Sequence, residues 1–328
     1  MATTSVFNRV RGALSVAERA VPRVALAAAP VGILLVLRAQ RDALAAVDWQ
    51  VSWRIAAVSV LGFVVAPLLQ GFSFWLALRM LTGTTPALDA LVVWSRSYVV
   101  RYAPTGALAV AYRVASRGRL DASAEQVLAA YGYEHVATLG AGAAACLALF
   151  ALAGGLPPWP ALVIAVAALV LVAAVRPGTL GRALQRIGAR FGLHVSALLP
   201  DRGLALLVAV NAAGWLGTGL GVFLIVGNVT GDVPGFLWLV GAYTAGYLVG
   251  FVTPLAPGGI GVREGMLVVL LRSSYGLGPA AAISIAIRVV NVAGELLAVA
   301  VIHAVYCLAL AARRVREQPV AAPEASVA

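Results

Sequence analysis

A chain of 328 residues that is 62% hydrophobic and only 11% charged lies outside the range of soluble domains, in which roughly 25% of residues are charged. Its 24 basic residues are all arginine and give a formal net charge of +11. Because most of these arginines lie in short segments between apolar runs, we interpret them as residues that set the orientation of the chain in the membrane and contact anionic lipid. This placement argues against nucleic-acid binding. We therefore interpret the chain as an all-α polytopic membrane protein.

Six apolar runs predict helices that cross the bilayer, for which about 20 residues are needed. They lie at residues 20–38, 54–81, 122–153, 158–176, 203–228 and 280–311. Together they predict a single transmembrane domain over 20–311, between a basic N-terminus (1–19) and a tail (312–328). The loop 177–202 has the pattern of an amphipathic helix at the membrane surface, with arginines at helical spacing: Arg182, Arg186 and Arg190.

The distribution of arginine predicts which side of the membrane each loop occupies. Both terminal segments, residues 113–119 and the loop 176–202 are rich in arginine, whereas the linkers GGLPP and NVTGDVP are almost uncharged. Positively charged loops stay in the cytoplasm, so we expect a multi-pass protein of the cell (inner or plasma) membrane with both termini cytoplasmic. Arg113, Arg119 and the basic loop are expected to attract anionic lipid at that surface.

Two further segments, 86–114 and 236–272, are apolar but are interrupted by proline and glycine. On this topology the first begins and ends in the cytoplasm and the second begins and ends outside, so each is predicted to be a re-entrant helical hairpin. Repeat A (54–153) and repeat B (203–311) then have the same order of elements in opposite orientation. This is the inverted repeat typical of transporters that bind their substrate near the middle of the membrane.

The second hairpin contains the sequence APGGIGVREG. Its glycines let the backbone bend and approach a ligand closely. A helix is predicted to begin near Glu264, so that free backbone N–H groups and the guanidinium of Arg263 would form a site for a phosphate. The alternative is a tight turn, from which Arg263 extends to the outer surface.

Polar residues on the last span share one helix face: Arg288, Asn291 and Glu295. Either they bind a ligand, or Arg288 forms an internal salt bridge with Glu264 or Glu295. Their counterparts in the first half are Arg101, Arg113 and Glu134. Four tyrosines near these counterparts are expected to form an aromatic belt at the membrane interface: Tyr98, Tyr102, Tyr131 and Tyr133.

Two motifs resemble those of a known family: PLAPGGIGVREG with Arg288 downstream, and RYAPTGALAVAYR with Glu134 downstream. The family they resemble is the flippase-like transmembrane family typified by the membrane half of bacterial lysylphosphatidylglycerol synthases, the multiple peptide resistance factors. The resemblance covers about residues 20–311. It implies transfer of an anionic, aminoacylated or polyprenyl-phosphate-linked lipid between leaflets. No counterpart of the soluble aminoacyl-transfer domain is apparent, so we do not expect the chain to make such a lipid.

The sequence therefore favours a lipid flippase that is not an enzyme and needs no cofactor or metal. Membrane lipids are the expected ligands, and a lipid-biosynthetic enzyme is a candidate partner. Two alternatives stay open: an integral-membrane glycosyltransferase or phosphatase acting on a polyprenyl phosphate, and a structural partner in a complex that builds the cell envelope. The residues predicted to bind the lipid headgroup are Arg101, Arg113, Glu134, Pro257, Gly258, Gly259, Gly261, Arg263, Glu264, Arg288, Asn291 and Glu295.

Overall fold

The computed structural model describes residues 38, 41, 52–99, 107–153, 182, 185, 186, 189, 199–232, 235–253, 259 and 261–317. All regular structure in these residues is helical, with no strands, which confirms the all-α class. The predicted spans 20–38 and 158–176, the N-terminus and most of the loop 177–202 lie outside the described residues.

The helices come in the same order twice. The first half consists of α3 (Trp53–Thr82), α4 (Ala87–Val99), α5 (Ala107–Ala115) with the short η2 (Ser116–Gly118), and α6 (Ala124–Ala153). The second half consists of α9 (Asp201–Thr230), α10 (Phe236–Val252), α11 (Val262–Tyr275) and α12 (Leu277–Glu317). Each half thus has a long helix, two shorter ones and another long helix, and each segment predicted as a hairpin contains two helices.

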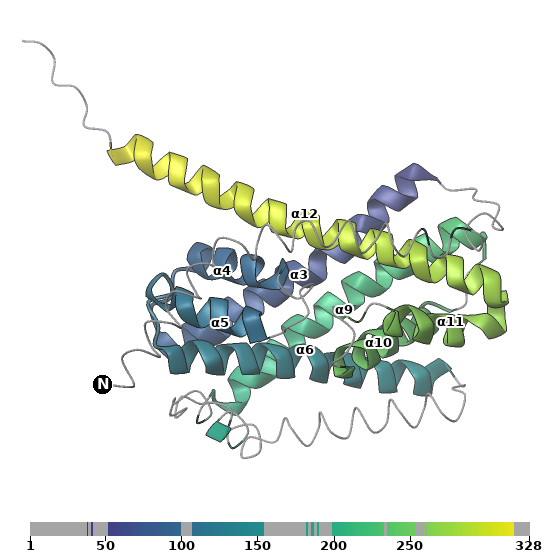
Figure 1. The fold of residues 1–328 in the computed structure, drawn as a ribbon, viewed down its shortest axis with the longest axis horizontal. Coiled ribbons are helices and arrows are strands. Elements are labelled where there is room, and N and C mark those ends of the chain that lie inside the picture. The colour runs from purple at the N-terminus through teal and green to yellow at the C-terminus, as the bar shows by residue number, and fades with distance from the viewer. Residues whose placement is uncertain are drawn as a thin grey trace, which may run out of the picture.

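The contacts between helices of the two halves also come in corresponding pairs. The most extensive contact joins α3 to α9, the first helices of the two halves. Helix α6 packs on α9 and α10, and correspondingly α12 packs on α3 and α4. Figure 1 shows α4 with α5 on one side of the bundle and α10 with α11 on the other. The two halves therefore interlock, since the last helix of each packs on the first two helices of the other.

Within the described part of the chain, three helices are long and apolar enough to cross a membrane: Trp53–Thr82, Arg202–Thr230 and Leu277–Arg314. Helices are also found at the predicted runs 54–81, 122–153, 203–228 and 280–311. Large apolar side chains lie on their outer faces: Leu61 is 57% exposed, Leu216 56% and Leu308 70%. Such surfaces are unfavourable in water and suit contact with lipid, so the structure supports a membrane protein.

Two helices extend beyond the apolar runs that predicted them. Asp201 and Arg202 already belong to α9 and not to the loop 177–202, and α12 continues to Glu317 instead of ending at residue 311. Hydropathy marks the part of a helix that contacts lipid, whereas the helix itself continues where its side chains become polar. The C-terminal part of α12 accordingly extends beyond the other helices (Figure 1).

Glycines allow α3 and α9 to approach closely. A Cβ atom on Gly62 of α3 would lie 2.7 Å from the backbone N of Gly221 and 2.8 Å from the carbonyl oxygen of Gly217. Helix association in lipid relies on such close backbone contact, because the hydrophobic effect between helices is weak there. This close approach forms part of the most extensive contact between the two halves.

We expect the substitution Gly62→Ala to lower the melting temperature of the purified protein, because overpacking a tight contact costs about 1–3 kcal/mol. The control is Gly265→Ala in α11, where an added Cβ would meet nothing within 4 Å. That control should be neutral or slightly stabilising, since alanine favours helix over glycine. Equal melting temperatures for wild type and Gly62→Ala would contradict the packing described here.

Candidate functional site

A buried ion pair joins α5 to α6 in the first half. Arg113 is 2% exposed and Glu134 3%, and the Arg113 guanidinium donates from Nη1 to Glu134 Oε2. Arg113 Nε also donates to Ser97 Oγ at 2.7 Å, and Trp94 Nε1 donates to Glu134 Oε1 at 2.7 Å. Both charged groups are therefore satisfied within the protein, as buried charges must be.

This geometry corrects one prediction from the sequence. Arg113 was expected to attract anionic lipid at the cytoplasmic surface, but its side chain is buried against Glu134, with Cζ 4.4 Å from the centroid of the Phe74 ring. Arg119 is exposed, and it donates hydrogen bonds to Asp89 Oδ1 at 3.0 Å and to the hydroxyl of Tyr306 at 2.8 Å. Arg101, the other predicted arginine of this half, lies outside the described residues.

A second ion pair joins α11 to α12. Arg288 Nε lies 3.5 Å from Glu264 Oε1, and this is one of the two salt bridges that the sequence left open. The other oxygen of Glu264, Oε2, accepts a hydrogen bond from the backbone N of Gly261 at 2.6 Å. This amide was expected to be open to an anion, but the protein's own carboxylate accepts its hydrogen bond.

The two ion pairs mirror one another with their charges exchanged. In the first half the arginine lies on the short helix α5 and the glutamate on the long helix α6. In the second half the glutamate lies on the short helix α11 and the arginine on the long helix α12. Each half therefore fixes its second short helix to its last long helix through one buried or nearly buried pair.

The loop before α11 has the backbone geometry that the glycine-rich motif predicts. Gly259 has φ 71° and Gly261 φ 84°, values that glycine adopts without the steric cost met by other residues. Gly259 also packs closely on α10, since a Cβ there would lie 3.2 Å from the Cα of Gly250. Pro257 and Gly258 lie outside the described residues.

Arg263 is buried next to two aromatic rings of α10. It is 4% exposed, and its Cζ lies 4.2 Å from the ring centroid of Tyr247 and 5.7 Å from that of Tyr243. A guanidinium stacked in this way is stabilised by the negative face of the ring. The alternative in which Arg263 extends to the outer surface is therefore wrong.

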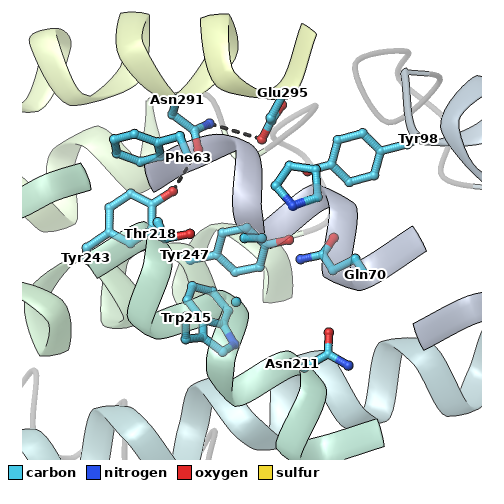
Figure 2. A pocket seen from close by; sticks show the side chains of 13 residues that line it. Phe63, Gln70, Tyr98, Asn211, Trp215, Thr218, Tyr243, Tyr247, Asn291 and Glu295 are labelled. Atoms are coloured by element: carbon cyan, nitrogen blue, oxygen red, sulfur yellow. Dashed lines mark hydrogen bonds between the residues drawn. The ribbon is translucent and has the colours of Figure 1, made fainter. Parts of the chain in front are cut away.

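The polar stripe of α12 faces the interior, as its spacing predicts. Asn291 Oδ1 accepts a hydrogen bond from the hydroxyl of Tyr243 at 2.9 Å, and Asn291 Nδ2 donates to Glu295 Oε1 at 3.0 Å. All three residues of the stripe, Arg288, Asn291 and Glu295, are buried. Figure 2 shows Asn291 and Glu295 at one side of a cavity.

This cavity lies between helices of both halves. It is lined by residues of α3, α4, α9, α10 and α12, and Figure 2 shows Gln70, Tyr98, Trp215 and Tyr247 around it. The cavity has a volume of about 20 Å³, counted as the space that the centres of water molecules can occupy. One water needs about 10–15 Å³ on the same measure. The cavity therefore has room for one or two waters, and a larger ligand would require the helices to separate.

Sequence reasoning missed most of the cavity lining. Asn211 of α9 accepts from Thr138 Oγ1 at 2.8 Å and donates to Ser73 Oγ at 2.9 Å, so it links α9 to α6 and α3. Trp215 donates from Nε1 to the carbonyl of Thr138 at 2.9 Å. The available signal was a single polar residue within an apolar run, which marks an inward face in a membrane helix.

The predicted aromatic belt is wrong for two of the four tyrosines. Tyr98 is 9% exposed and lines the cavity, stacked on Trp94 with ring centroids 4.5 Å apart. Tyr133 is 4% exposed, and its hydroxyl accepts from the backbone N of Leu199 at 2.9 Å. Tyr102 lies outside the described residues. Tyr98 and Tyr133 are therefore internal side chains and not interfacial anchors.

Among the described residues, no three or more histidine, cysteine, aspartate or glutamate side chains are grouped in a way that could hold a metal ion. The chemistry of the candidate site is thus that of two Arg–Glu pairs, one stacked arginine and a polar cavity. No protein-family model matches the sequence, and a search of curated proteins finds no match either.

Proposed function

We propose that the protein is a lipid flippase that moves an anionic or aminoacylated phospholipid, or a polyprenyl-phosphate-linked lipid, between the leaflets of the cell membrane. The observation that carries this proposal is the polar cavity between two matching halves of a protein whose outer faces are apolar. Intramembrane charges are costly and usually mark a transport path or a ligand site. The flippase-like family that the sequence resembles fits the same function.

The proposal includes an inverted repeat of about six full spans and two re-entrant hairpins, with both termini cytoplasmic. It is supported by the repeated order of helices, the exchange of contacts between halves and the mirrored Arg–Glu pairs. Two such halves can rock against each other so that a central cavity opens first to one side and then to the other. Each hairpin would bring its polar residues to the depth of that cavity.

The proposed path for the lipid phosphate leads past Arg263. Its guanidinium is next to Tyr247, which itself lines the cavity. A planar guanidinium binds two phosphate oxygens at once. Glu264 holds the start of α11 by accepting from Gly261, and Arg288 holds Glu264, so this pair would position Arg263 while the acyl chains stay in the bilayer.

The topology can be tested by cysteine labelling. We expect Arg117, in the arginine-rich segment after α5, and Ser274, near the end of α11, to lie on opposite sides of the membrane. Each would be replaced singly by cysteine in a Cys307→Ser background, because Cys307 is exposed whereas Cys146 is buried. A maleimide that cannot cross membranes should reach only position 274 in intact cells. Labelling of both positions from one side would contradict the inverted repeat.

The function itself can be tested on lipid that co-purifies with the protein. Mass spectrometry should find a phosphate-bearing lipid enriched over its share in the bulk membrane, and incubation with that lipid should leave it chemically unchanged. A modified lipid would favour the glycosyltransferase or phosphatase alternative. Co-purified lipid with the composition of the bulk membrane would count against any headgroup-dependent function.

A further inference from the structure

We infer that the cavity binds the neutral, hydroxyl-bearing part of a lipid headgroup, while the phosphate of the same lipid lies at Arg263. This inference rests on the proposed function and names the class of headgroup. It follows from the chemistry of the cavity lining, from the hydrogen-bonding groups left open there, and from the position of Tyr247 between the cavity and Arg263.

The lining consists of groups that both donate and accept hydrogen bonds. Carboxamides come from Gln70, Asn211 and Asn291, and hydroxyls come from Thr218 and the tyrosines. An amide offers two N–H donors and one acceptor oxygen, and a phenol can donate and accept. Sugar and glycerol hydroxyls need partners of both kinds, which a cluster of like charges cannot provide.

Two of these groups are open to a ligand. The carboxamide of Gln70 and the hydroxyl of Tyr247 line the cavity, and neither makes a side-chain hydrogen bond to another residue in the part of the chain that the structure describes. Polar groups enclosed in a protein are nearly always hydrogen-bonded. A ligand with hydroxyls, or water in its absence, would satisfy both.

The charges around the cavity exclude other headgroups. Among the described residues that line it, the charged one is Glu295, so a phosphate or carboxylate inside the cavity would be repelled. Glu295 would attract an ammonium group, but the guanidinium of Arg263, which stacks on Tyr247 with Cζ 4.2 Å from the ring centroid, would repel it. A neutral polyol fits both restrictions.

Tyr247 connects the two parts of the site. Its ring contacts Arg263, and the same side chain lines the cavity. In a lipid such as phosphatidylglycerol or phosphatidylinositol, the polyol is bonded directly to the phosphate. A phosphate at Arg263 therefore places the polyol of the same lipid next to the cavity. When the two halves separate, the hydroxyls of the polyol would occupy the space that otherwise has room for one or two waters.

The test compares four lipids bound by the full-length protein in nanodiscs: phosphatidylglycerol, phosphatidylinositol, phosphatidic acid and phosphatidylethanolamine. We expect the two polyol lipids to bind about tenfold more tightly than the other two, as one or two added hydrogen bonds would give. Gln70→Leu should remove most of this preference and leave the affinity for phosphatidic acid unchanged. The matched control is Gln185→Leu, at an exposed position, which should keep the preference.

Each other outcome overturns a defined part of the inference. Equal affinity for phosphatidic acid and the polyol lipids would show a phosphate site alone and would leave the flippase proposal standing. Tighter binding of phosphatidylethanolamine would indicate a cationic headgroup instead. A full preference in Gln70→Leu would place the polyol outside the cavity. Competition by equal concentrations of soluble myo-inositol 1-phosphate would identify a soluble ligand, and no binding of any of the lipids would overturn the flippase proposal as well.

Discussion

The substitution Glu134→Gln is expected to lower the free energy of unfolding by about 3–5 kcal/mol, because it leaves a buried arginine without its countercharge. The side chains of Arg113 and Glu134 are 3% and 4% exposed, so water cannot replace the lost carboxylate. Glutamine keeps the size of the side chain and can still accept from Trp94. The measurement is thermal and denaturant unfolding of the purified protein in detergent.

The control is the same chemical change at an exposed ion pair. Asp89 accepts a hydrogen bond from Arg119 Nη2 at 3.0 Å, and the side chains of Arg119 and Asp89 are 38% and 27% exposed. Pairs of this kind contribute about 0–1 kcal/mol, so Asp89→Asn should have little effect. If Glu134→Gln lowered the free energy of unfolding as little as Asp89→Asn does, the ion pair between Arg113 and Glu134 would not stabilise the protein as a buried pair should.

The second large effect is expected for Arg263→Lys, which should weaken binding of a phosphate-bearing lipid at least about tenfold and leave the melting temperature nearly unchanged. Lysine keeps the positive charge but loses the planar fork that contacts two phosphate oxygens and stacks on Tyr247. A tenfold loss corresponds to about 1.4 kcal/mol, which is the size of one charge-assisted hydrogen bond.

Arg272→Lys is the matched control for this effect. Arg272 is exposed in the last turn of the same helix, α11, so the same substitution there should change neither affinity nor stability. Equal lipid affinity in wild type and Arg263→Lys would show that Arg263 only packs against α10. A large loss of stability in Arg263→Lys, together with lost binding, would indicate a structural contribution.

The long helices could be predicted from sequence because a bilayer permits few alternatives. A backbone in lipid must satisfy its own hydrogen bonds, so a long apolar run such as 54–81 predicts a helix, and α3 is found there. The glycine-rich break before α11 was predictable for a similar reason, since few sequences place so many glycines within an apolar run. The ends of α12 were less predictable because hydropathy reports the solvent around a helix and not its hydrogen bonds.

The contacts within the site depended on tertiary structure. Glu264 and Glu295 were both candidates for Arg288, because the sequence does not show how the helix of Glu264 packs on the helix of Arg288. The packing of α11 on α12 brings Glu264 to Arg288, while Asn291 donates to Glu295 one turn away on its own helix. The cavity residues were missed because each helix supplies only one or a few polar groups, and their convergence depends on how the two halves interlock.

Leaflet transfer in reconstituted vesicles tests the central claim most directly. The measurement is the rate at which labelled phosphatidylglycerol moves from the inner to the outer leaflet of vesicles that contain the wild-type protein, Arg263→Lys or Arg272→Lys, or no protein. We predict rapid transfer with wild type and Arg272→Lys. With Arg263→Lys we predict a rate reduced at least about tenfold, the same factor by which this variant should bind the phosphate-bearing lipid more weakly. Transfer by the folded wild-type protein no faster than in protein-free vesicles would contradict the account.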